Sequence, residues 1–468
     1  MVLNSGSNKN DSHPKRIRSS QGADERIAFS DKPGLRARQA ASKILAAVVD
    51  KKTSLDGMLD SERGNPTYRE LSDADRSLVR AIVNTALRHL PRIEAAIESL
   101  IDNPLPPGAR ALDHVLVSAA AQILYLDVPD HSAVDLAVEQ AQIDPRNRRF
   151  ASLVNAVLRR LSREKTAVLA RIETVPTMPS WFFERLVAAY GKERAIRIAA
   201  SQLVPAAIDI TVKSDAAGWA ECLSGHVLPT GSVRLASFSG AIQALDGFSD
   251  GEWWVQDAAA SIPARLFGSL ADKTVADLCA APGGKTAQLV MAGADVTALD
   301  QSSSRLKRLK DNLARLGLSA KTKETNMVDF APEILFDAAL LDAPCSSTGT
   351  TRRHPDVLWT KGPQDIEKLA SVQEKLLRHS LGLVKPGGTI VFSNCSLDPL
   401  EGEAVVAKVL ADRPDYERVP IDAANWPGLE NAISPLGEFR TTPEMLPVPD
   451  GFAGGLDGFF ACVLRRIG

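Results

Sequence analysis

Two cysteines of this 468-residue chain stand in surroundings that suit thiol chemistry better than core packing. Cys345 lies in Asp342-Ala-Pro-Cys-Ser-Ser-Thr-Gly-Thr350, and Cys395 lies in Ser393-Asn-Cys-Ser-Leu397. A cysteine at the end of a strand is commonly a small apolar core residue, and that interpretation is open for either one alone. Both cysteines are flanked by polar residues or proline, and each follows an apolar run that predicts a strand. Together they favour a functional pair.

A third segment, Asp277-Leu-Cys-Ala-Ala-Pro-Gly-Gly-Lys-Thr286, has the small residues of a ligand-binding loop. Its end imitates a phosphate-binding P-loop, but that loop needs glycine five positions before Gly284, where Cys279 stands. A dinucleotide fingerprint is excluded because the segment holds no G-x-G-x-x-G. The remaining functional interpretation is a nucleoside-cofactor loop, in which small residues allow close backbone approach at a helix N-terminus. The alternative is a strand–helix turn with incidental glycines.

These three segments are far apart in the sequence and can meet only if a sheet brings them together. The pattern of residues 251–468 predicts such a sheet. Short apolar runs alternate with helical patterns, which is typical of a doubly wound, mostly parallel α/β sheet. Ligands of such sheets bind at the carboxyl ends of the strands. Asp300 lies 23 residues after Asp277, at the end of the next strand, where a carboxylate can accept hydrogen bonds from ribose hydroxyls. The expected strands are Thr274–Cys279, Asp295–Asp300, Phe336–Asp342 and Gly388–Ser393, and the expected helices are Ser302–Gly317 and Gln364–Val384.

The chain before this region divides into three parts. Residues 1–32 are polar and charged without apolar periodicity, which predicts a disordered tail. Residues 33–165 carry apolar residues at helical spacing and predict an all-α domain. Residues 166–250 are mixed, and we interpret them as a linker followed by a small α+β subdomain. Within that part we expect the helix Trp181–Tyr190 and the strands Ala207–Lys213 and Ser232–Leu235.

Composition limits the class of protein. Apolar residues make up 44% of the chain and charged residues 24%, which excludes a mainly disordered chain. Five scattered cysteines exclude a disulfide framework and favour free thiols in a reducing cytoplasm. No run of about 18 apolar residues occurs, so we expect no membrane-spanning helix. A monomer is favoured, although the sequence does not fix the oligomeric state.

Jointly, the motifs resemble those of the RNA 5-methylcytosine methyltransferases that use S-adenosylmethionine (SAM). The match rests on the loop Asp277–Thr286, on Asp342-Ala-Pro-Cys-Ser346, and on Asn394-Cys-Ser396 followed by Glu401-Gly-Glu403. The helical N-terminus resembles a NusB domain, notably at Phe150-Ala-Ser-Leu-Val-Asn-Ala-Val-Leu-Arg-Arg160. That pairing, with Arg352-Arg-His-Pro-Asp-Val-Leu-Trp359, is similar to the bacterial small-subunit (16S) ribosomal RNA enzymes of the Sun type. The resemblance covers most of the chain and is weakest in the middle.

The resemblance implies methyl transfer to cytosine C5 through a covalent intermediate and requires no metal. C5 is a poor nucleophile, so a thiolate first adds to C6; C5 then takes the methyl group, its proton leaves, and the thiolate is eliminated. Cys395 corresponds to the nucleophile, Cys345 to the cysteine needed for product release, and Asp342 to the carboxylate that contacts the cytosine edge and the cofactor region. Asp300 would hold the ribose. The methionine and ribose part of SAM would lie along Cys279, Ala280, Ala281, Pro282, Gly283, Gly284 and Lys285.

Three positions depart from the family pattern. Asn394 stands where threonine usually precedes the nucleophile, and it remains polar. Glu401-Gly-Glu403 replaces Glu-Asn-Glu, which loses one amide contact. The acidic residue that should face the adenine falls on Asn326, with Asp329 nearby as the alternative. An amide can still form a hydrogen bond with adenine, so we expect weaker rather than absent cofactor binding.

The net charge of −2 argues mildly against a nucleic-acid partner when the chain is taken whole. It averages two unlike parts, because residues 398–457 hold four basic and 12 acidic residues, a balance of −8, which leaves +6 elsewhere. Six arginines and a lysine gather in Arg146–Lys165 against Glu164 alone, which predicts an RNA-facing patch or a solvated helix face. Further positive charge lies in Arg305–Lys323. Arg352, Arg353 and His354 follow the Cys345 motif, and we expect them to contact RNA phosphates.

Two other functions stay open at the level of sequence. One is a tRNA cytosine-C5 methyltransferase, which the helical N-terminus and Arg352-Arg-His-Pro355 disfavour. The other is a non-catalytic RNA-binding or antitermination factor built on the NusB-like domain. An intact cofactor loop and both cysteines disfavour that second function. For either methyltransferase, the target base must be single-stranded or flipped out of its stack.

Overall fold

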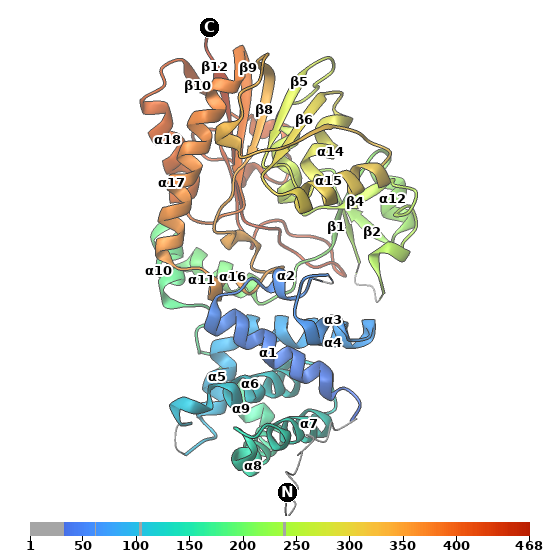
Figure 1. Ribbon diagram of the computed structural model, residues 1–468. Coiled ribbons are helices and arrows are strands. Elements are labelled where there is room, and N and C mark those ends of the chain that lie inside the picture. The colour runs from blue at the N-terminus through green and yellow to red at the C-terminus, as the bar shows by residue number, and fades with distance from the viewer. Residues whose placement is uncertain (1–31, 61, 103–104, 237–239) are drawn as a thin grey trace, which may run out of the picture.

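The computed structural model describes residues 32–60, 62–102, 105–236 and 240–468 (Figure 1). The expected disordered tail, residues 1–32, lies outside the described residues except for Lys32. Within the described ranges, no helix is both long enough and apolar enough to cross a bilayer.

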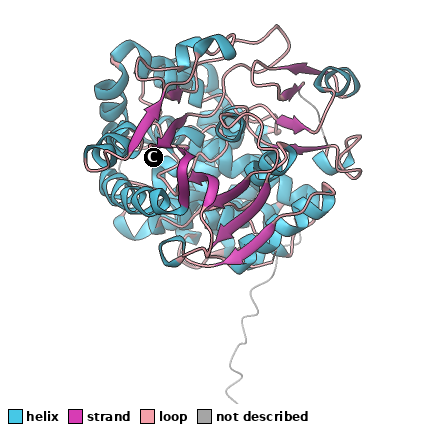
Figure 2. Ribbon diagram, turned by 90° about the horizontal axis from the view of Figure 1, so that it is seen from above, coloured by secondary structure: helices cyan, strands magenta, loops and turns pink. Residues whose placement is uncertain are grey.

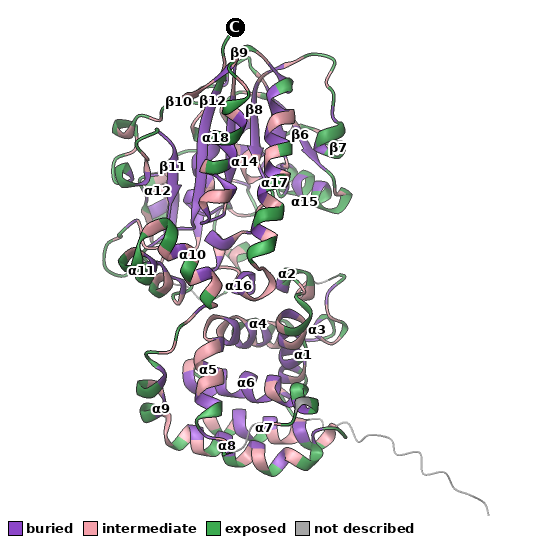
Figure 3. Cartoon of the chain, turned by 90° about the vertical axis from the view of Figure 1, so that its left-hand side faces the viewer, coloured by how far each residue is buried: buried purple, intermediate pink, exposed green. Residues whose placement is uncertain are grey.

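The first part of the described chain is entirely helical. Helix α6 lies at its centre, and nearly all of α6 from Leu112 to Leu124 is buried among the neighbouring helices, as Figure 3 shows. This agrees with the apolar periodicity of the sequence, which predicted an all-α region. The helices are α1 (Leu35–Lys51), α2 (Leu55–Met58), α3 (Pro66–Arg69), α4 (Asp73–Arg88), α5 (Leu90–Glu98), α6 (Arg110–Tyr125), α7 (Asp130–Ile143), α8 (Ala151–Arg163) and α9 (Lys165–Ile172).

A small four-stranded sheet follows two connecting helices. Its strands are antiparallel in the order β2-β3-β1-β4, and Trp253, Ile210 and Val233 form its core with α12. The expected helix and both expected strands are confirmed within a residue or two. The elements are α10 (Ser180–Tyr190), α11 (Lys192–Gln202), β1 (Asp209–Val212), α12 (Ala216–Cys222), β2 (Gly225–Val227), β3 (Val233–Leu235) and β4 (Trp253–Val255).

The C-terminal part is built on a larger sheet with the strand order β10-β12-β9-β8-β5-β6-β7. Strands β9, β8, β5, β6 and β7 are parallel, whereas β12 runs antiparallel between β9 and β10 (Figures 1 and 2). The predicted mostly parallel α/β sheet is thereby confirmed. Its strands are β5 (Thr274–Leu278), β6 (Asp295–Asp300), β7 (Lys321–Glu324), β8 (Phe336–Asp342), β9 (Val384–Asn394), β10 (Tyr416–Val419), β11 (Phe439–Thr441) and β12 (Phe459–Arg466).

Helices cover both faces of this sheet because its buried strands are apolar on both sides. Along β8, Leu341 packs toward α17 and α18, while Leu340 packs toward α13 and α14 on the opposite face. This alternation is the period-two pattern of a strand with two covered faces. The helices are α13 (Ile262–Arg265), α14 (Gly284–Met291), α15 (Ser303–Arg315), α16 (Val357–Thr360), α17 (Pro363–Ser380) and α18 (Glu403–Ala411).

The segment that follows Cys345 contacts the helical part. The Leu55 N–H donates to Asp356 Oδ2 at 3.0 Å, and the Trp359 Nε1–H donates to the Leu87 carbonyl at 2.8 Å. Arg88 Nη2 donates to the Arg352 carbonyl at 2.7 Å. These contacts anchor the chain between Cys345 and α17 against α2 and α4.

Candidate active site

The motif residues lie along one edge of the large sheet, because parallel strands end at the same side. Strands β5, β6, β8 and β9 end at Leu278, Asp300, Asp342 and Asn394. In the register of β8 and β9, Asp342 is paired with Ser393, so the two cysteine segments leave neighbouring strands side by side. The apolar strand pattern thus brings residues more than 100 positions apart in the chain to one edge.

The two thiols are in direct contact. Cys345 Sγ and Cys395 Sγ are 3.4 Å apart, and Ser347 Oγ lies 3.6 Å from Cys395 Sγ and 3.9 Å from Cys345 Sγ. The hydrogen bond with Cys345, together with Ser347, lowers the pKa of Cys395 despite its burial. The same bond, with burial, raises the pKa of Cys345 well above its ordinary value. Of the pair, Cys395 is therefore the thiol that more readily becomes a thiolate.

The loop after β5 is held against α15 in a conformation that needs glycine. Gly283 has φ +101°, and a Cβ there would lie 2.9 Å from Leu309 Cγ. Asn312 Nδ2 donates to the Pro282 carbonyl at 2.9 Å, and Arg305 Nη2 donates to the Ala281 carbonyl at 2.8 Å. The small residues of the loop therefore serve close packing on α15 and lead directly into the N-terminus of α14.

A cavity of about 320 Å³ joins the thiols to the end of β6. Asp300 and Asn326 line one part of it and Cys345 and Cys395 another, whereas Asp329 is not among its lining residues. The remaining lining residues are Cys279, Ala281, Leu299, Gln301, Arg305, Thr325, Met327, Asp342, Ala343, Pro344, Ser347, Val372 and Leu376.

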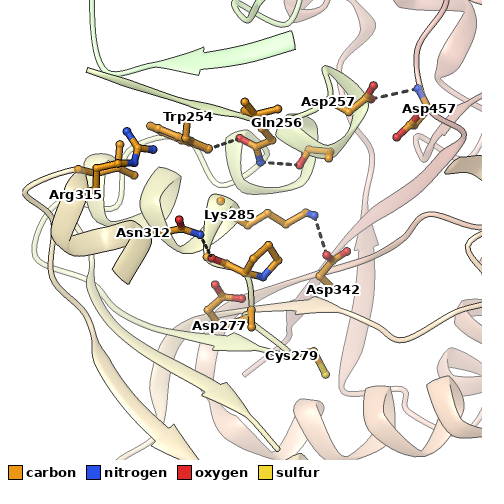
Figure 4. A pocket seen from close by; sticks show the side chains of 18 of the residues that line it. Trp254, Gln256, Asp257, Asp277, Cys279, Lys285, Asn312, Arg315, Asp342 and Asp457 are labelled. Carbon is orange, nitrogen blue, oxygen red and sulfur yellow. Dashed lines mark hydrogen bonds and ion pairs between the residues drawn. The ribbon is translucent and has the colours of Figure 1, made fainter. Parts of the chain in front are cut away.

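A second cavity, of about 470 Å³, lies on the other side of the cofactor loop (Figure 4). Its lining includes Phe248, Trp254, Asn312 and Arg315 together with Asp277 and Lys285. Both cavities share Cys279, Ala281 and Asp342, which form the boundary between them. Every residue of the predicted cofactor loop from Cys279 to Lys285 lines this cavity, whereas only Cys279 and Ala281 of that loop also line the first one. Phe248, Trp254 and Arg315 were not predicted, because they come from the loop before β4, from β4 and from α15 and form no local motif.

Three carboxylates determine the electrostatics of the site. Asp342 accepts hydrogen bonds from Lys285 Nζ at 2.7 Å and from Ser393 Oγ at 2.9 Å. Asp277 is fully buried, accepts from Thr286 Oγ1 at 2.5 Å, and has a pKa raised to about 7, mainly by burial. Asp277 Oδ1 and Asp300 Oδ2 are buried and accept no hydrogen bond, although Arg305 lies 3.1 Å from Asp300 Oδ2. Open acceptors beside a cavity suit a ligand with hydroxyl and amino donors, such as a nucleoside.

The expectation that Arg352 contacts RNA phosphates is wrong, whereas Arg353 lines the cavity of about 470 Å³ and is paired there with carboxylates of the protein. Arg352 is only 3% exposed and donates to the Gly454 carbonyl at 2.9 Å. Arg353 is held by Asp257 Oδ2 at 2.5 Å and by Asp457 Oδ2 at 3.1 Å. Guanidinium groups are always charged and need many acceptors, which Arg352 finds in buried carbonyls and Arg353 in two carboxylates beside the cavity. His354 is half-exposed, but it faces Asp56 of the helical part, with 3.5 Å between Nδ1 and Oδ2.

The departures at Asn394 and Gly402 have structural explanations. Asn394 Nδ2 donates to the Glu401 carbonyl, and its Oδ1 accepts from Ser396 N at 3.0 Å, so this amide shapes the turn around Cys395. At Gly402, a Cβ would lie 2.6 Å from Arg440 Nη2 and 2.8 Å from Phe460 Cγ. Arg440 thus occupies the space beside Gly402, and it donates to the Ser396 carbonyl.

The sheet order, the reversed strand β12 and the ligand-binding edge define a class I SAM-dependent methyltransferase. Family comparison matches residues 267–465 to the family "16S rRNA methyltransferase RsmB/F" and residues 35–163 to the NusB family. The ribosomal RNA small subunit methyltransferase B of Klebsiella pneumoniae is 33% identical over 417 residues, which cover 86% of this chain and 95% of the relative. The chain therefore belongs to the RsmB/F family of 16S rRNA methyltransferases.

A second curated relative and two solved structures are also similar to this chain. The enzyme of the same name from Sodalis glossinidius is 33% identical over 90% of this chain and 96% of its own length. The crystal structure of a methyltransferase homologue from Pyrococcus horikoshii is 27% identical and covers 64% of this chain and 97% of its own, with a TM-score of 0.52. The crystal structure of PH0851, 21% identical, covers 93% of this chain and 99% of its own with a TM-score of 0.69, which shows that the fold is shared.

Proposed function

We propose that this chain transfers a methyl group from SAM to C5 of a cytosine in small-subunit ribosomal RNA through a covalent bond between Cys395 and C6. The observation that carries the proposal is the thiol pair. Cys395 has a lowered pKa, lies 3.4 Å from Cys345, and opens into the same cavity as Asp300 and Asn326. A nucleophile and a nucleoside-binding wall in one cavity are what covalent methyl transfer to a base requires.

The cofactor would lie across the ends of β5 and β6. Asp300 would accept hydrogen bonds from the ribose hydroxyls, and Asn326 would face the adenine. Asp277 lines the larger cavity and Asp300 the smaller one, and each has a buried oxygen that accepts no hydrogen bond, which supports a ligand with donors that reaches across the boundary between the cavities. SAM, when bound, supplies an electrophilic methyl group. The loop that would line its methionine and ribose comprises Cys279, Ala280, Ala281, Pro282, Gly283, Gly284 and Lys285.

Three residues of the protein, Cys395, Asp342 and Cys345, would act on the cytosine base. The Cys395 thiolate forms a bond to C6, and the electron pair of the C5–C6 double bond becomes available at C5 for the methyl group. Asp342, fixed by Lys285 and Ser393, would hold the edge of the cytosine at the boundary of the two cavities. After methylation the C5 proton passes to water, the electron pair of the C5–H bond forms the C5–C6 double bond again, and Cys395 departs from C6 as a thiolate. Cys345 would serve this elimination, because its thiol lies 3.4 Å from Cys395 Sγ and can donate a hydrogen bond to the departing thiolate.

The helical part supplies a second region for RNA. Five arginines of the predicted basic segment are exposed on and before α8, and Arg149 also packs over the Phe150 ring at 4.6 Å. When exposed arginines bind RNA phosphates, counterions are released, and the affinity then falls as the salt concentration rises. Replacing Arg149 and Arg163 by alanine should therefore weaken binding to RNA of any sequence. It should also make the affinity less dependent on salt, by the equivalent of about two phosphate contacts. The five are Arg146, Arg148, Arg149, Arg159 and Arg163.

The proposal is tested with labelled SAM and small-subunit rRNA, offered naked and as ribosomal particles. Cys395→Ala should abolish methyl transfer, and Cys345→Ala should accumulate a covalent protein–RNA adduct. Cys222→Ala, which changes an exposed cysteine of α12 far from the thiol pair, should behave as wild type. Full activity of Cys395→Ala would refute the covalent mechanism. Bisulfite sequencing of total RNA with and without the gene would identify the cytosine, and loss of protection in tRNA alone would refute the rRNA substrate.

A further inference from the structure

The two cysteine segments are tied to one buried carboxylate. Each cysteine is followed by a serine, and both serines contact Glu401, which is 0% exposed. Ser396 Oγ donates to Glu401 Oε2 at 2.7 Å. Ser346 contacts the carboxylate twice, through its backbone N–H to Oε1 at 2.8 Å and through its hydroxyl to Oε2. Glu401 therefore bridges the residue after Cys345 and the residue after Cys395.

A third element completes this bridge. Gln373 of α17 donates through Nε2 to Glu401 Oε1 at 3.0 Å and to the Pro344 carbonyl at 3.1 Å. The Glu401 carboxylate thus accepts from three different residues: Oε1 from the Ser346 N–H and the Gln373 amide, and Oε2 from the two serine hydroxyls, which can also accept. Burial raises the pKa of Glu401, and the hydrogen bonds from Ser346 and Ser396 oppose that change. A buried carboxylate that accepts this many hydrogen bonds fixes the relative positions of the segments that donate them.

Glu401 does not belong to the wall of either cavity described above. It therefore reaches the reacting atoms only through residues beside the cysteines: Ser346 and Ser396, Pro344 by way of Gln373, and Asn394, whose amide donates to the Glu401 carbonyl. We propose that Glu401 is a positioning residue of the methyl-transfer reaction, which sets the relative position of the Cys345 and Cys395 thiols through Ser346 and Ser396. This inference rests on the proposed covalent function of the two cysteines.

The two serines should affect different steps of the reaction. Ser346→Ala loosens the segment of Cys345, so the covalent adduct should form at nearly the normal rate and be released slowly. Ser396→Ala loosens the segment of Cys395, so adduct formation should be slow. Glu401→Asp is too short to reach both segments and should slow both steps, by about 10²-fold if the thiols shift by about 1 Å. Glu401→Gln keeps the length and one acceptor oxygen, so it should restore most of the rate.

These variants are compared in single-turnover experiments that measure adduct formation and product release separately, with rates expressed per folded molecule. Glu374→Gln is the matched control, because Glu374 follows Gln373 on α17 but pairs outward with Lys408 and Arg378. If Glu401 only stabilised the fold, the variants would have a lower melting temperature, but their folded molecules would react at the wild-type rates. A positioning role also shifts the acid limb of the adduct-formation pH profile to higher pH in Glu401→Asp, since Cys395 loses its hydrogen bond from Cys345.

The outcomes separate the two proposals. If Cys395→Ala keeps its activity, the covalent function fails, and the role of Glu401 fails with it. If Cys395→Ala is inactive but Ser346→Ala, Ser396→Ala and Glu401→Asp keep wild-type rates and pH profiles, only the inference about Glu401 is overturned. If Glu401→Asp does not fold, the two serine variants decide, because each removes one hydroxyl and retains the carboxylate.

Discussion

Lys285 donates a hydrogen bond to Asp342 at the boundary between the two cavities, with 2.7 Å between Nζ and Oδ2 (Figure 4). The lysine comes from the first turn of α14 and the aspartate from the end of β8, so the cofactor loop and the first cysteine motif meet in this ion pair. Lys285 Nζ also lies 4.9 Å from the centre of the Phe459 ring. The pair is partly buried, with the Asp342 side chain 30% exposed, and Asp342 thus keeps a fixed orientation toward the space between the cavities.

Replacing Lys285 by methionine should slow methyl transfer about 10- to 100-fold, which corresponds to losing one hydrogen bond to a charged group. Methionine keeps most of the volume over Phe459 but leaves Asp342 without its cation. The rate is measured in single turnover, and SAM affinity is measured by calorimetry. Lys285→Arg, which retains the charge, should lose less. A wild-type rate in Lys285→Met would show that the ion pair does not orient Asp342 for the reaction.

Asn326→Asp should increase the affinity for SAM several-fold. Asn326 lines the same cavity as Asp300, and a carboxylate accepts a hydrogen bond from an adenine amino group more strongly than an amide does. Equilibrium binding of SAM measures the change. Asp329→Asn is the control, because Asp329 is exposed and does not line the cavity. The assignment of Asn326 would be contradicted by a loss of affinity in Asp329→Asn together with no change in Asn326→Asp.

Most of the fold could be predicted because it follows from local patterns. The apolar runs that end at Leu278, Asp300 and Asp342 are buried strands whose alternation with helices already specifies a parallel sheet. Once the strands are parallel, their carboxyl ends must share one edge, so the meeting of Asp342, Cys345 and Cys395 could also be anticipated. The distance between the two thiols, in contrast, could be learned only from the structure.

What could not be predicted depends on contacts between distant segments. Arg352 and Arg353 have the sequence signature of a basic surface loop, but their acceptors come from the loop between α11 and β1, the segment before β12 and the residues after β4. The space beside Gly402 is filled by Arg440, 38 residues later in the chain. No periodicity links such pairs, because tertiary packing alone decides whether a charged side chain meets solvent or a buried carboxylate.

Asp277→Asn should change how the stability of the cofactor-free protein depends on pH. Burial raises the pKa of Asp277 from 3.8 to about 7, so the folded state binds this proton more tightly than the unfolded state. The free energy of unfolding therefore falls as pH rises between these two values, by at most about 1.4 kcal/mol per pH unit. Asparagine cannot titrate, so the variant should lose this slope and gain stability relative to wild type above pH 7.

Urea denaturation at several pH values between 4 and 8 measures that difference. The comparison of variant with wild type cancels the titration of groups that both proteins share. Asparagine can still accept the hydrogen bond from Thr286, so the local geometry is kept. A difference in stability that stays constant from pH 4 to pH 8 would mean that Asp277 does not titrate in this range.

Gly402→Asn, which introduces the residue usual in the family, should destabilise this chain by about 1–3 kcal/mol instead of restoring a contact. A side chain at this position meets Arg440 Nη2 at 2.6 Å, and Arg440 cannot move freely because Glu403 and the Ser396 carbonyl hold its guanidinium. The test is a double-mutant cycle by urea denaturation. If Arg440 is the obstacle, Gly402→Asn should cost less in an Arg440→Ala background, and the coupling energy should favour the double variant. Additive effects would instead identify Phe460, whose ring lies 2.8 Å from the same Cβ position, as the group that keeps residue 402 a glycine.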